Sequence, residues 1–266
     1  MRISWLTGAA GLVALVAAGC ATPAADSPYF GRTEPPAGQH MRYVSGSEPE
    51  SLDPQLGTSQ PDARIMMALF DGLTEYDPQT AQAIPALAER WEPNEDNTAF
   101  TFYLRDAHWS DGTPITADDI VYSVRRGMSP DLAARTAYMG YDISNAQAYN
   151  EGAMFVRDPS SGAFLMDPAA PAERLTVPGD PADRARALEA PALAAARGKQ
   201  YVAIRAEDIG IEAVDPRTLR FRLRQPVPFV PKLVSHQFFR ASPRQAVDRH
   251  GARWTQPEHI VTSGAF

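Results

Sequence analysis

Alternation of hydrophobic and polar residues predicts strands at several places along the chain. FTFYLR (100–105) alternates in this way, which is typical of a strand with one buried face. IGIEAV (209–214) and TLRFRL (218–223) alternate as well, and the turn residues 215–217 between them predict a hairpin. A further strand is predicted at MRYVSG (41–46).

Apolar residues spaced three to four apart predict helices between these strands. One helix is expected over residues 63–70, ending at an Asp-Gly pair. A short helix is expected over 86–90. Another is expected in SPRQAVDRHG, with Ser242 as its N-cap and Gly251 just after its end. Helices and strands therefore mix along the chain.

The stretch WSDGTPITADDIVYSVRR (109–126) combines a turn with a helix start. Asp111 precedes a glycine, which is a common arrangement in turns. Thr116 and Asp119 match the T-x-x-D capping pattern, and the Thr116 hydroxyl is expected to accept from N–H groups of the first turn. Asp118 and Asp119 then lie where the helix dipole is positive. A turn and a helix N-terminus therefore explain why acidic residues stand at all three positions.

The same three acids are the strongest hint of catalysis in the sequence. A glycosidase needs two carboxylates across a cleft, one with a raised pKa. Asp118 and Asp119 are adjacent and would point about 100° apart on a helix. A secreted hydrolase that uses Asp111, Asp118 and Asp119 is therefore kept as an alternative, and the scaffold interpretation is favoured.

Other polar and aromatic residues favour surface or packing positions. Glu48 and Glu50 flank a proline beside a strand end, and they are expected to face solvent, with a ligand-facing role as the alternative. Trp91, Trp109 and Trp254 are expected to pack in the core or at the edge of a cleft.

Composition narrows the function classes further. The 266 residues carry a net charge of −7 without a cluster of Lys or Arg, so no nucleic-acid partner is expected. Phosphate loops, dinucleotide fingerprints and nucleophile elbows are absent from the sequence. The histidines have no second ligand at metal-binding spacing, so neither a metal site nor a cofactor is predicted; they are His40, His108, His236, His250 and His259.

The N-terminus has the pattern of a secretory signal. Arg2 precedes a mostly apolar run over 3–18, which is followed by small residues and by Cys20, the only cysteine. This resembles a bacterial lipoprotein signal over residues 1–20, in which Cys20 becomes lipidated, although Ala17 stands where leucine is usual. The alternative is an ordinary cleavable signal with an incidental cysteine. Residues 21–40 are rich in Pro, Ala and Gly and predict a flexible tether.

Six ordered motifs carry a family resemblance. The chain is similar to the extracellular solute-binding proteins of bacterial peptide importers, the family-5 type, and the last two motifs resemble its oligopeptide-binding branch. The resemblance covers about 41–266 apart from 149–199. The motifs are SEPESLDP (47–54), LFDGL (69–73), LAERWEP (87–93), TFYLRDAHWSDGTPITADDIVYS (101–123), QPVPFVPKL (225–233) and WTQPEHIVTSGAF (254–266).

The resemblance implies an α/β fold with mixed α+β lobes, like a type II periplasmic binding protein. Residues 41–70 and 244–266 would belong to the main lobe, and 71–243 to a smaller second lobe. The insertion at about 149–199 is rich in Ala, Pro and Asp and poor in strand pattern, so it is expected to hold loops and one short Ala-rich helix near 185–197. A third lobe, with the aspartate that pairs with the peptide's amino terminus, would lie beyond Phe266, so the fold is expected to be incomplete.

The same resemblance implies a function without catalysis. A lipid-anchored periplasmic protein, monomeric, would bind oligopeptides in an extended conformation and deliver them to the inner-membrane permease of an ABC importer. Main-chain hydrogen bonds would supply affinity without reading side chains. An anchored sensor or adaptor of the same fold is the alternative.

The resemblance also suggests ligand-binding residues by position. Thr58, Ser59 and Gln60 match an extended segment that lines the peptide cleft, although related proteins have an acidic residue at the position of Thr58. Arg135 falls where they carry a cleft tyrosine, and Tyr138 lies close by in the sequence. Ordinary loop surface is the alternative for each of them.

Overall fold

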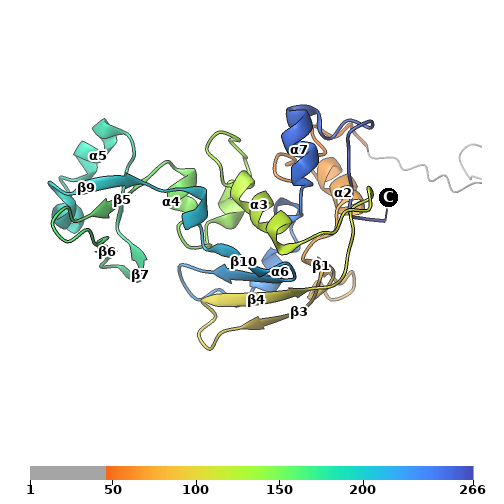
Figure 1. Ribbon diagram of the computed structural model, residues 1–266, viewed down its shortest axis with the longest axis horizontal. Helices are drawn as coiled ribbons and strands as arrows, with labels where there is room; N and C mark the ends of the chain where they lie inside the picture. Colours follow the sequence, from red (N-terminus) through yellow and green to blue (C-terminus); the bar gives the residue numbers. More distant parts are fainter. Residues whose placement is uncertain (1–45, 266) are drawn as a thin grey trace, which may run out of the picture. The chain divides into compact units, whose positions relative to one another are not determined.

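A four-stranded antiparallel sheet organises residues 46–265, the part of the chain that the computed structural model describes (Figure 1). Its strand order is β10-β11-β4-β3. The outer hairpin joins β10 (Ile211–Asp215) to β11 (Thr218–Arg222), and β4 (Ala99–Leu104) lies between β11 and β3 (Ala88–Pro93). The predicted hairpin and the predicted strand at 100–105 are both confirmed.

The short helix expected over 86–90 is wrong, because these residues lead into β3. The register between β3 and β4 shifts between Ala88 and Arg90. A bulge of this kind breaks the alternation of inward and outward side chains that identifies a strand from sequence. Trp91 packs against Phe102 of β4 with ring centres 6.2 Å apart. Contact with the neighbouring strand therefore favours the extended conformation of residues 88–93.

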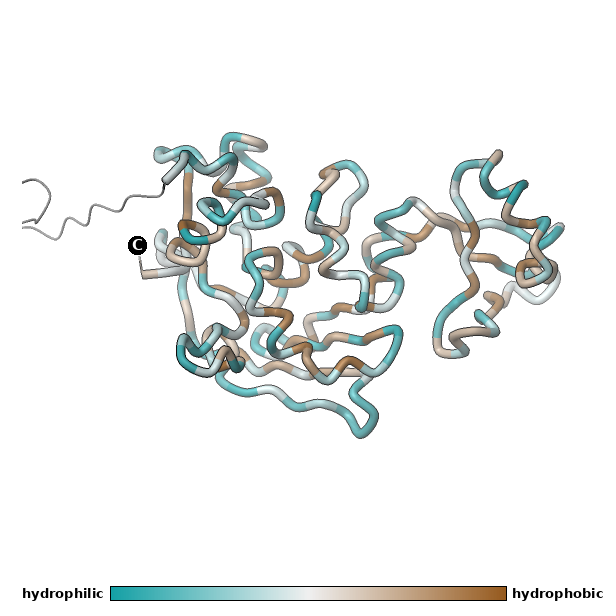
Figure 2. The backbone as a smooth tube through the Cα atoms, turned by 180° about the vertical axis from the view of Figure 1, so that it is seen from behind, coloured by the Kyte–Doolittle hydropathy of each residue, from teal (hydrophilic) through white to brown (hydrophobic). Residues whose placement is uncertain are grey.

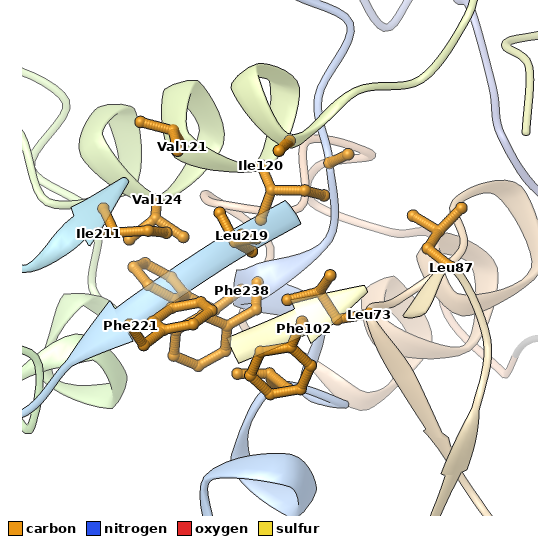
Figure 3. Packing of buried hydrophobic residues seen from close by; sticks show 14 of the residues in the cluster. Leu73, Leu87, Phe102, Ile120, Val121, Val124, Ile211, Leu219, Phe221 and Phe238 are labelled. Carbon is orange, nitrogen blue, oxygen red and sulfur yellow. The ribbon is translucent and has the colours of Figure 1, made fainter. Parts of the chain in front are cut away.

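Helix α3 (Ala117–Gly127) covers one face of this sheet. Figure 3 shows Ile120 and Val124 pointing from α3 toward the side chains of β11, among them Phe221. Phe221 in turn meets Phe102 edge to face at 5.6 Å. These residues are almost completely buried and belong to one hydrophobic cluster. In Figure 2 the hydrophobic residues gather along the packed strands and helices, and the outer loops are mostly hydrophilic.

The cap of α3 is confirmed in position and differs in one hydrogen bond. Thr116 and Asp119 form a capping box. The Asp119 carboxylate accepts from the N–H of Thr116 at 2.8 Å and from its hydroxyl at 3.2 Å. The Thr116 hydroxyl thus donates to Asp119 where the sequence predicts that it accepts from the first turn.

Helix α2 (Gln60–Leu69) confirms the helix predicted over 63–70 and begins three residues earlier. Ser59 is its N-cap, and the N–H of Asp62 donates to the Ser59 hydroxyl at 3.2 Å. The expectation that 58–60 forms one extended segment is therefore wrong at Gln60, which opens the helix. The Ser59–Asp62 cap follows the same spacing as Thr116–Asp119 and was missed.

Residues 149–199 contain more regular structure than the sequence predicts. The helix expected near 185–197 is present as two short helices, over 181–187 and 191–196. The expectation that loops fill the rest is wrong, since two small sheets form here and just past residue 199, in the orders β8-β5-β9 and β6-β7 (Figure 1). Two of these strands have only two residues, and the sequences MFVR and APAER in two others do not alternate between hydrophobic and polar residues. The elements are β5 (Met154–Arg157), β6 (Met166–Asp167), β7 (Ala170–Arg174), β8 (Thr176–Val177), α5 (Pro181–Ala187), η2 (Pro191–Ala196) and β9 (Gln200–Ala203).

Ser242 is not the N-cap of the following helix. Helix α7 (Arg244–His250) starts after Pro243, and Gly251 follows its end as predicted. Ser242 is buried, and its hydroxyl donates to the Gln55 side chain at 2.7 Å. Local spacing predicts that the Ser242 side chain caps α7, but this side chain instead binds Gln55, which lies 187 residues earlier in the sequence.

The remaining helices and strands are short, with three to five residues each. They are β1 (Thr74–Tyr76), β2 (Ala83–Pro85), η1 (Ala137–Gly140), α4 (Ala146–Asn150), η3 (Ala206–Asp208), α6 (Val230–Leu233), η4 (Gln237–Phe239) and η5 (Gly251–Arg253). None of the helices described over 46–265 is both long and apolar enough to cross a membrane.

The predicted N-terminal segments lie outside the described residues. These are the signal at 1–20 with Cys20, the tether at 21–40 and nearly all of the strand at 41–46. Residues from Gly46 onward group as one compact unit. The division of this unit into lobes at 71 and 243 stays a prediction.

Candidate functional site

A buried carboxylate organises the segment that was predicted to bind ligand. Asp62 accepts from the backbone N–H groups of Thr58 and Ser59, both at 2.9 Å, and from that of Glu50 at 2.8 Å. Burial opposes ionisation of Asp62, but hydrogen bonds from Ser59, Thr58 and Glu50 outweigh it and hold the pKa of the carboxyl below its usual value. The backbone from Glu50 to α2 is thereby fixed around one charge.

Glu50 links this segment to Arg135. Its carboxylate accepts from Nη2 of Arg135 at 2.7 Å, and about two thirds of each side chain is exposed. The surface position predicted for Glu50 is confirmed, and its ion pair was not foreseen. Tyr138, in η1, is 62% exposed, and no described contact joins it to Thr58, Ser59 or Gln60. The structure thus places Arg135 beside the loop through Glu50, and Tyr138 remains separate.

A second carboxylate–arginine pair lies buried, three residues further along the chain. Asp53 receives Nη1 of Arg126 at 2.9 Å and Nη2 at 2.5 Å. The indole N–H of Trp254 donates to the same carboxylate at 3.0 Å, and the backbone N–H of Gln55 does so at 3.0 Å. The packing role predicted for Trp254 is confirmed, and its polar contact is additional.

Gln55 extends this network with every polar atom of its side chain. Its amide nitrogen donates to the carbonyls of Phe238 at 3.1 Å and Arg240 at 3.0 Å. Its amide oxygen accepts from Arg126 at 2.9 Å and from Ser242 at 2.7 Å. The SLDPQ segment therefore joins α3 to residues 238–242, and it acts as the scaffold under the exposed loop.

The three acids of the hydrolase alternative are used by local structure or exposed. Asp111 accepts from the N–H and hydroxyl of Thr113 at 2.9 and 2.6 Å, which lowers the pKa of its carboxyl. Burial raises the pKa of the Asp119 carboxyl, and both hydrogen bonds from Thr116 oppose this. Both acids line one hollow of about 290 Å³, whereas Asp118 is exposed and does not line it. The turn and cap roles account for the hydrogen bonds from Thr113 and Thr116, and the Trp109 side chain also donates to Asp119.

The side chains of residues 46–265 form no candidate metal site. No set of three or more His, Cys, Asp and Glu side chains there is arranged to hold a metal ion. His250 and His259 do come together, with parallel rings whose centres are 3.8 Å apart. Stacked faces direct the ring nitrogens sideways, so this pair forms no chelate.

Known periplasmic binding proteins match the chain over most of its length. The periplasmic oligopeptide-binding protein OppA of Escherichia coli (strain K12) is 34% identical over 260 residues, which are 97% of this chain and 38% of that protein. The probable deoxycholate-binding periplasmic protein YgiS of the same organism is 31% identical, over 86% of this chain and 34% of that protein. The chain thus spans less than two fifths of these relatives.

Solved structures agree with the fold. Haemophilus influenzae OppA in complex with RPPGFSPFR matches with a TM-score of 0.60 and 26% identity, over 83% of this chain and 34% of that one. These matches confirm the predicted periplasmic-binding-protein fold with mixed helices and strands. The model of the bacterial extracellular solute-binding proteins, family 5 Middle, matches residues 82–266. Since that match takes in more than half of the chain, the chain belongs to the family-5 bacterial extracellular solute-binding proteins.

Proposed function

We propose that the chain forms part of the substrate-binding component of an ABC importer, which binds extended oligopeptides and delivers them to a membrane permease. The observation that carries the proposal is the match to OppA along 97% of this chain. A structural relative is described in complex with a nine-residue peptide. The protein binds and does not catalyse in this proposal, as its relatives are named for what they bind.

The ligand face in this proposal consists of the α2 entry and Arg135. Thr58, Ser59, Gln60, Arg135 and Tyr138 are its members. Asp62 supports the role of the loop, because it holds the backbone of Thr58 and Ser59 in place before any ligand arrives. A preorganised loop loses little conformational entropy on binding.

The site of action in this proposal is the periplasmic face of a membrane, with Cys20 as the lipid-modified residue and a monomeric protein. Expression in a bacterial host followed by membrane fractionation tests the anchor. Wild type is expected in the membrane pellet with a lipid mass on its N-terminal peptide. Cys20→Ala is expected in the soluble fraction, and an unmodified wild-type protein would contradict the proposal.

Calorimetric titration with tri- to pentapeptides tests ligand binding. The chain should be compared with a form continued along the gene's reading frame past Phe266. The continued form is expected to bind micromolar or tighter, and the 266-residue chain much more weakly, because it spans about a third of its structural relatives. Neither heat nor thermal stabilisation of the continued form across the library would contradict peptide binding.

Bile acids are a second ligand class to test, because one relative is named as a probable deoxycholate-binding protein. Titrating the continued form with deoxycholate below its micelle concentration separates the two classes. Heat with deoxycholate and none with peptides would replace the oligopeptide in the proposal by an amphipathic acid. The binding-protein role itself would remain.

A further inference from the structure

A second hollow is lined by residues of α3 and of segments that pack near it. It has a volume of about 620 Å³ and is lined by residues spaced three to four apart along α3, among them Tyr122 and Arg125. Tyr149 of α4 and Arg244 of α7 complete its walls. The residues proposed above to contact peptide do not line it, so it requires an explanation of its own.

Arg125 is the cation of this hollow that lacks a carboxylate partner within residues 46–265. Its one hydrogen bond there runs from Nη2 to the carbonyl of Ile211 at 3.3 Å. Its Nε is buried without an acceptor. Arg126 and Arg244, which line the same hollow, each pair with an aspartate. A guanidinium without enough acceptors is costly to bury, and a bound anion is one way to satisfy it.

Two tyrosines provide further donors and an apolar wall. The hydroxyls of Tyr122 and Tyr149 form no hydrogen bond with any described residue, although both side chains are half-buried. The guanidinium carbon of Arg244 lies 5.5 Å from the ring centre of Tyr122. Phenol hydroxyls beside a guanidinium suit a carboxylate, which accepts from both, and the rings suit an apolar body attached to it.

The acids at the rim limit the charge of such a ligand. Asp118 and Glu207 also line the hollow, and neither has a described ion pair. Asp118 precedes Arg125 by seven residues, which is about 10 Å along the helix axis. A doubly charged anion such as phosphate would be repelled by these acids, whereas a single carboxylate at Arg125 is far enough from Asp118 to be tolerated.

We propose that this hollow is an accessory site for a small monocarboxylate with an apolar or aromatic body. The carboxylate accepts from Arg125 and from the hydroxyls of Tyr122 and Tyr149, and the body packs between the two tyrosine rings. The site is independent of the peptide site proposed above, and its walls come from α3, α4 and α7.

The test uses 3-phenylpropionate as the probe, with 3-phenylpropionamide and inorganic phosphate as matched controls. Saturation-transfer NMR on the 266-residue chain is expected to show binding of the acid in the millimolar range or tighter. The amide and phosphate are expected to bind at least about tenfold more weakly. Equal binding of acid and amide, or no binding of the acid, would overturn the proposal.

Variants locate the site. Arg125→Gln is expected to weaken the acid at least about tenfold. Arg186→Gln, which removes an exposed arginine from α5, is expected to change nothing. Because Arg125→Gln also removes the bond to Ile211, Tyr122→Phe serves as the second variant, and thermal unfolding confirms that both are folded. If a folded Arg125→Gln variant bound 3-phenylpropionate as well as wild type does, the proposed accessory site would be rejected.

Competition separates this site from the peptide site. On a form of the protein that binds peptide, saturating peptide is expected to leave binding of 3-phenylpropionate unchanged. Displacement of the acid by peptide would show that both occupy one site, and the accessory site would then be rejected while peptide binding stood. Absence of peptide binding would remove the main proposal and leave the NMR test of the hollow intact.

Discussion

Two arginine–carboxylate pairs start only three residues apart, yet they do different things. Asp53 and Arg126 approach to 2.5 Å with side chains that are 5% and 14% exposed. Glu50 and Arg135 approach to 2.7 Å with side chains that are 65% and 68% exposed. The distances are nearly equal, so the surroundings must decide what each pair contributes.

The buried pair is surrounded by further donors, and the exposed pair is not. The carboxylate of Asp53 also receives the indole N–H of Trp254 and the N–H of Gln55. The only described partner of the Glu50 carboxylate is Arg135. Removing one member of a buried pair strands a charge, whereas water replaces a lost partner at the surface. Burial therefore makes one pair part of the scaffold, whereas solvent can replace either partner in the other.

The largest effect that tests this contrast is expected from Asp53→Ala. Arg126 would keep its buried position without a counter-ion, and the free energy of unfolding is expected to fall by about 3–5 kcal/mol. Urea denaturation measures it. Asp111→Ala, at an exposed turn, is the matched control and should cost under about 1 kcal/mol. A loss from Asp53→Ala no larger than that of the control would erase the distinction between the pairs.

Asp62 provides a pH test with a smaller effect. Asp62→Asn is expected to cost about 1–3 kcal/mol at pH 7, because three backbone N–H groups donate to its charge. Its pKa is lowered in the folded state, so this stabilisation is present above the unfolded value near 3.8 and is lost as pH falls through the folded value. Unfolding curves of wild type and variant should converge in acid; a constant gap between them would count against the assignment.

Asp119 tests a half-buried carboxylate that has no arginine partner. Asp119→Ala removes the acceptor for the N–H and hydroxyl of Thr116 and is expected to cost about 1 kcal/mol. Asp118→Ala, at the exposed neighbouring position, is expected to cost a few tenths of a kcal/mol through the helix dipole. Thermal unfolding of both variants shows which substitution costs more stability. A larger loss from Asp118→Ala would show that the cap is assigned to the wrong acid.

Local patterns predicted the elements whose stability is local. The alternation around 209–223 indicated the hairpin, and the Thr116–Asp119 spacing indicated the start of α3 because a cap depends on neighbours in sequence. The same spacing at Ser59–Asp62 was available and overlooked. The strand at 88–93 escaped prediction because its bulge breaks the period of two.

Contacts between distant segments could not be foreseen in this way. Asp53 pairs with Arg126 across 73 residues and with Trp254 across 201 residues. No period or spacing in the sequence relates such partners. Sequence placed Arg135 near the candidate ligand face only through a family resemblance, and its link to Glu50 required coordinates.

The smallest expected effect is the most demanding test of the comparison. A double-mutant cycle with Glu50→Gln, Arg135→Gln and the combined variant isolates the coupling free energy of the exposed pair. Solvent screening and the entropy of two long side chains should hold it to about 0.5 kcal/mol or less. Urea denaturation at low and at 0.5 M salt gives the value. A coupling above about 1 kcal/mol that survives salt would mean that Glu50 holds Arg135 more firmly than an exposed pair should, and exposure would no longer separate the two pairs. Arg135 would then be unable to turn toward a ligand, and the proposed ligand face would have to rest on Thr58, Ser59, Gln60 and Tyr138.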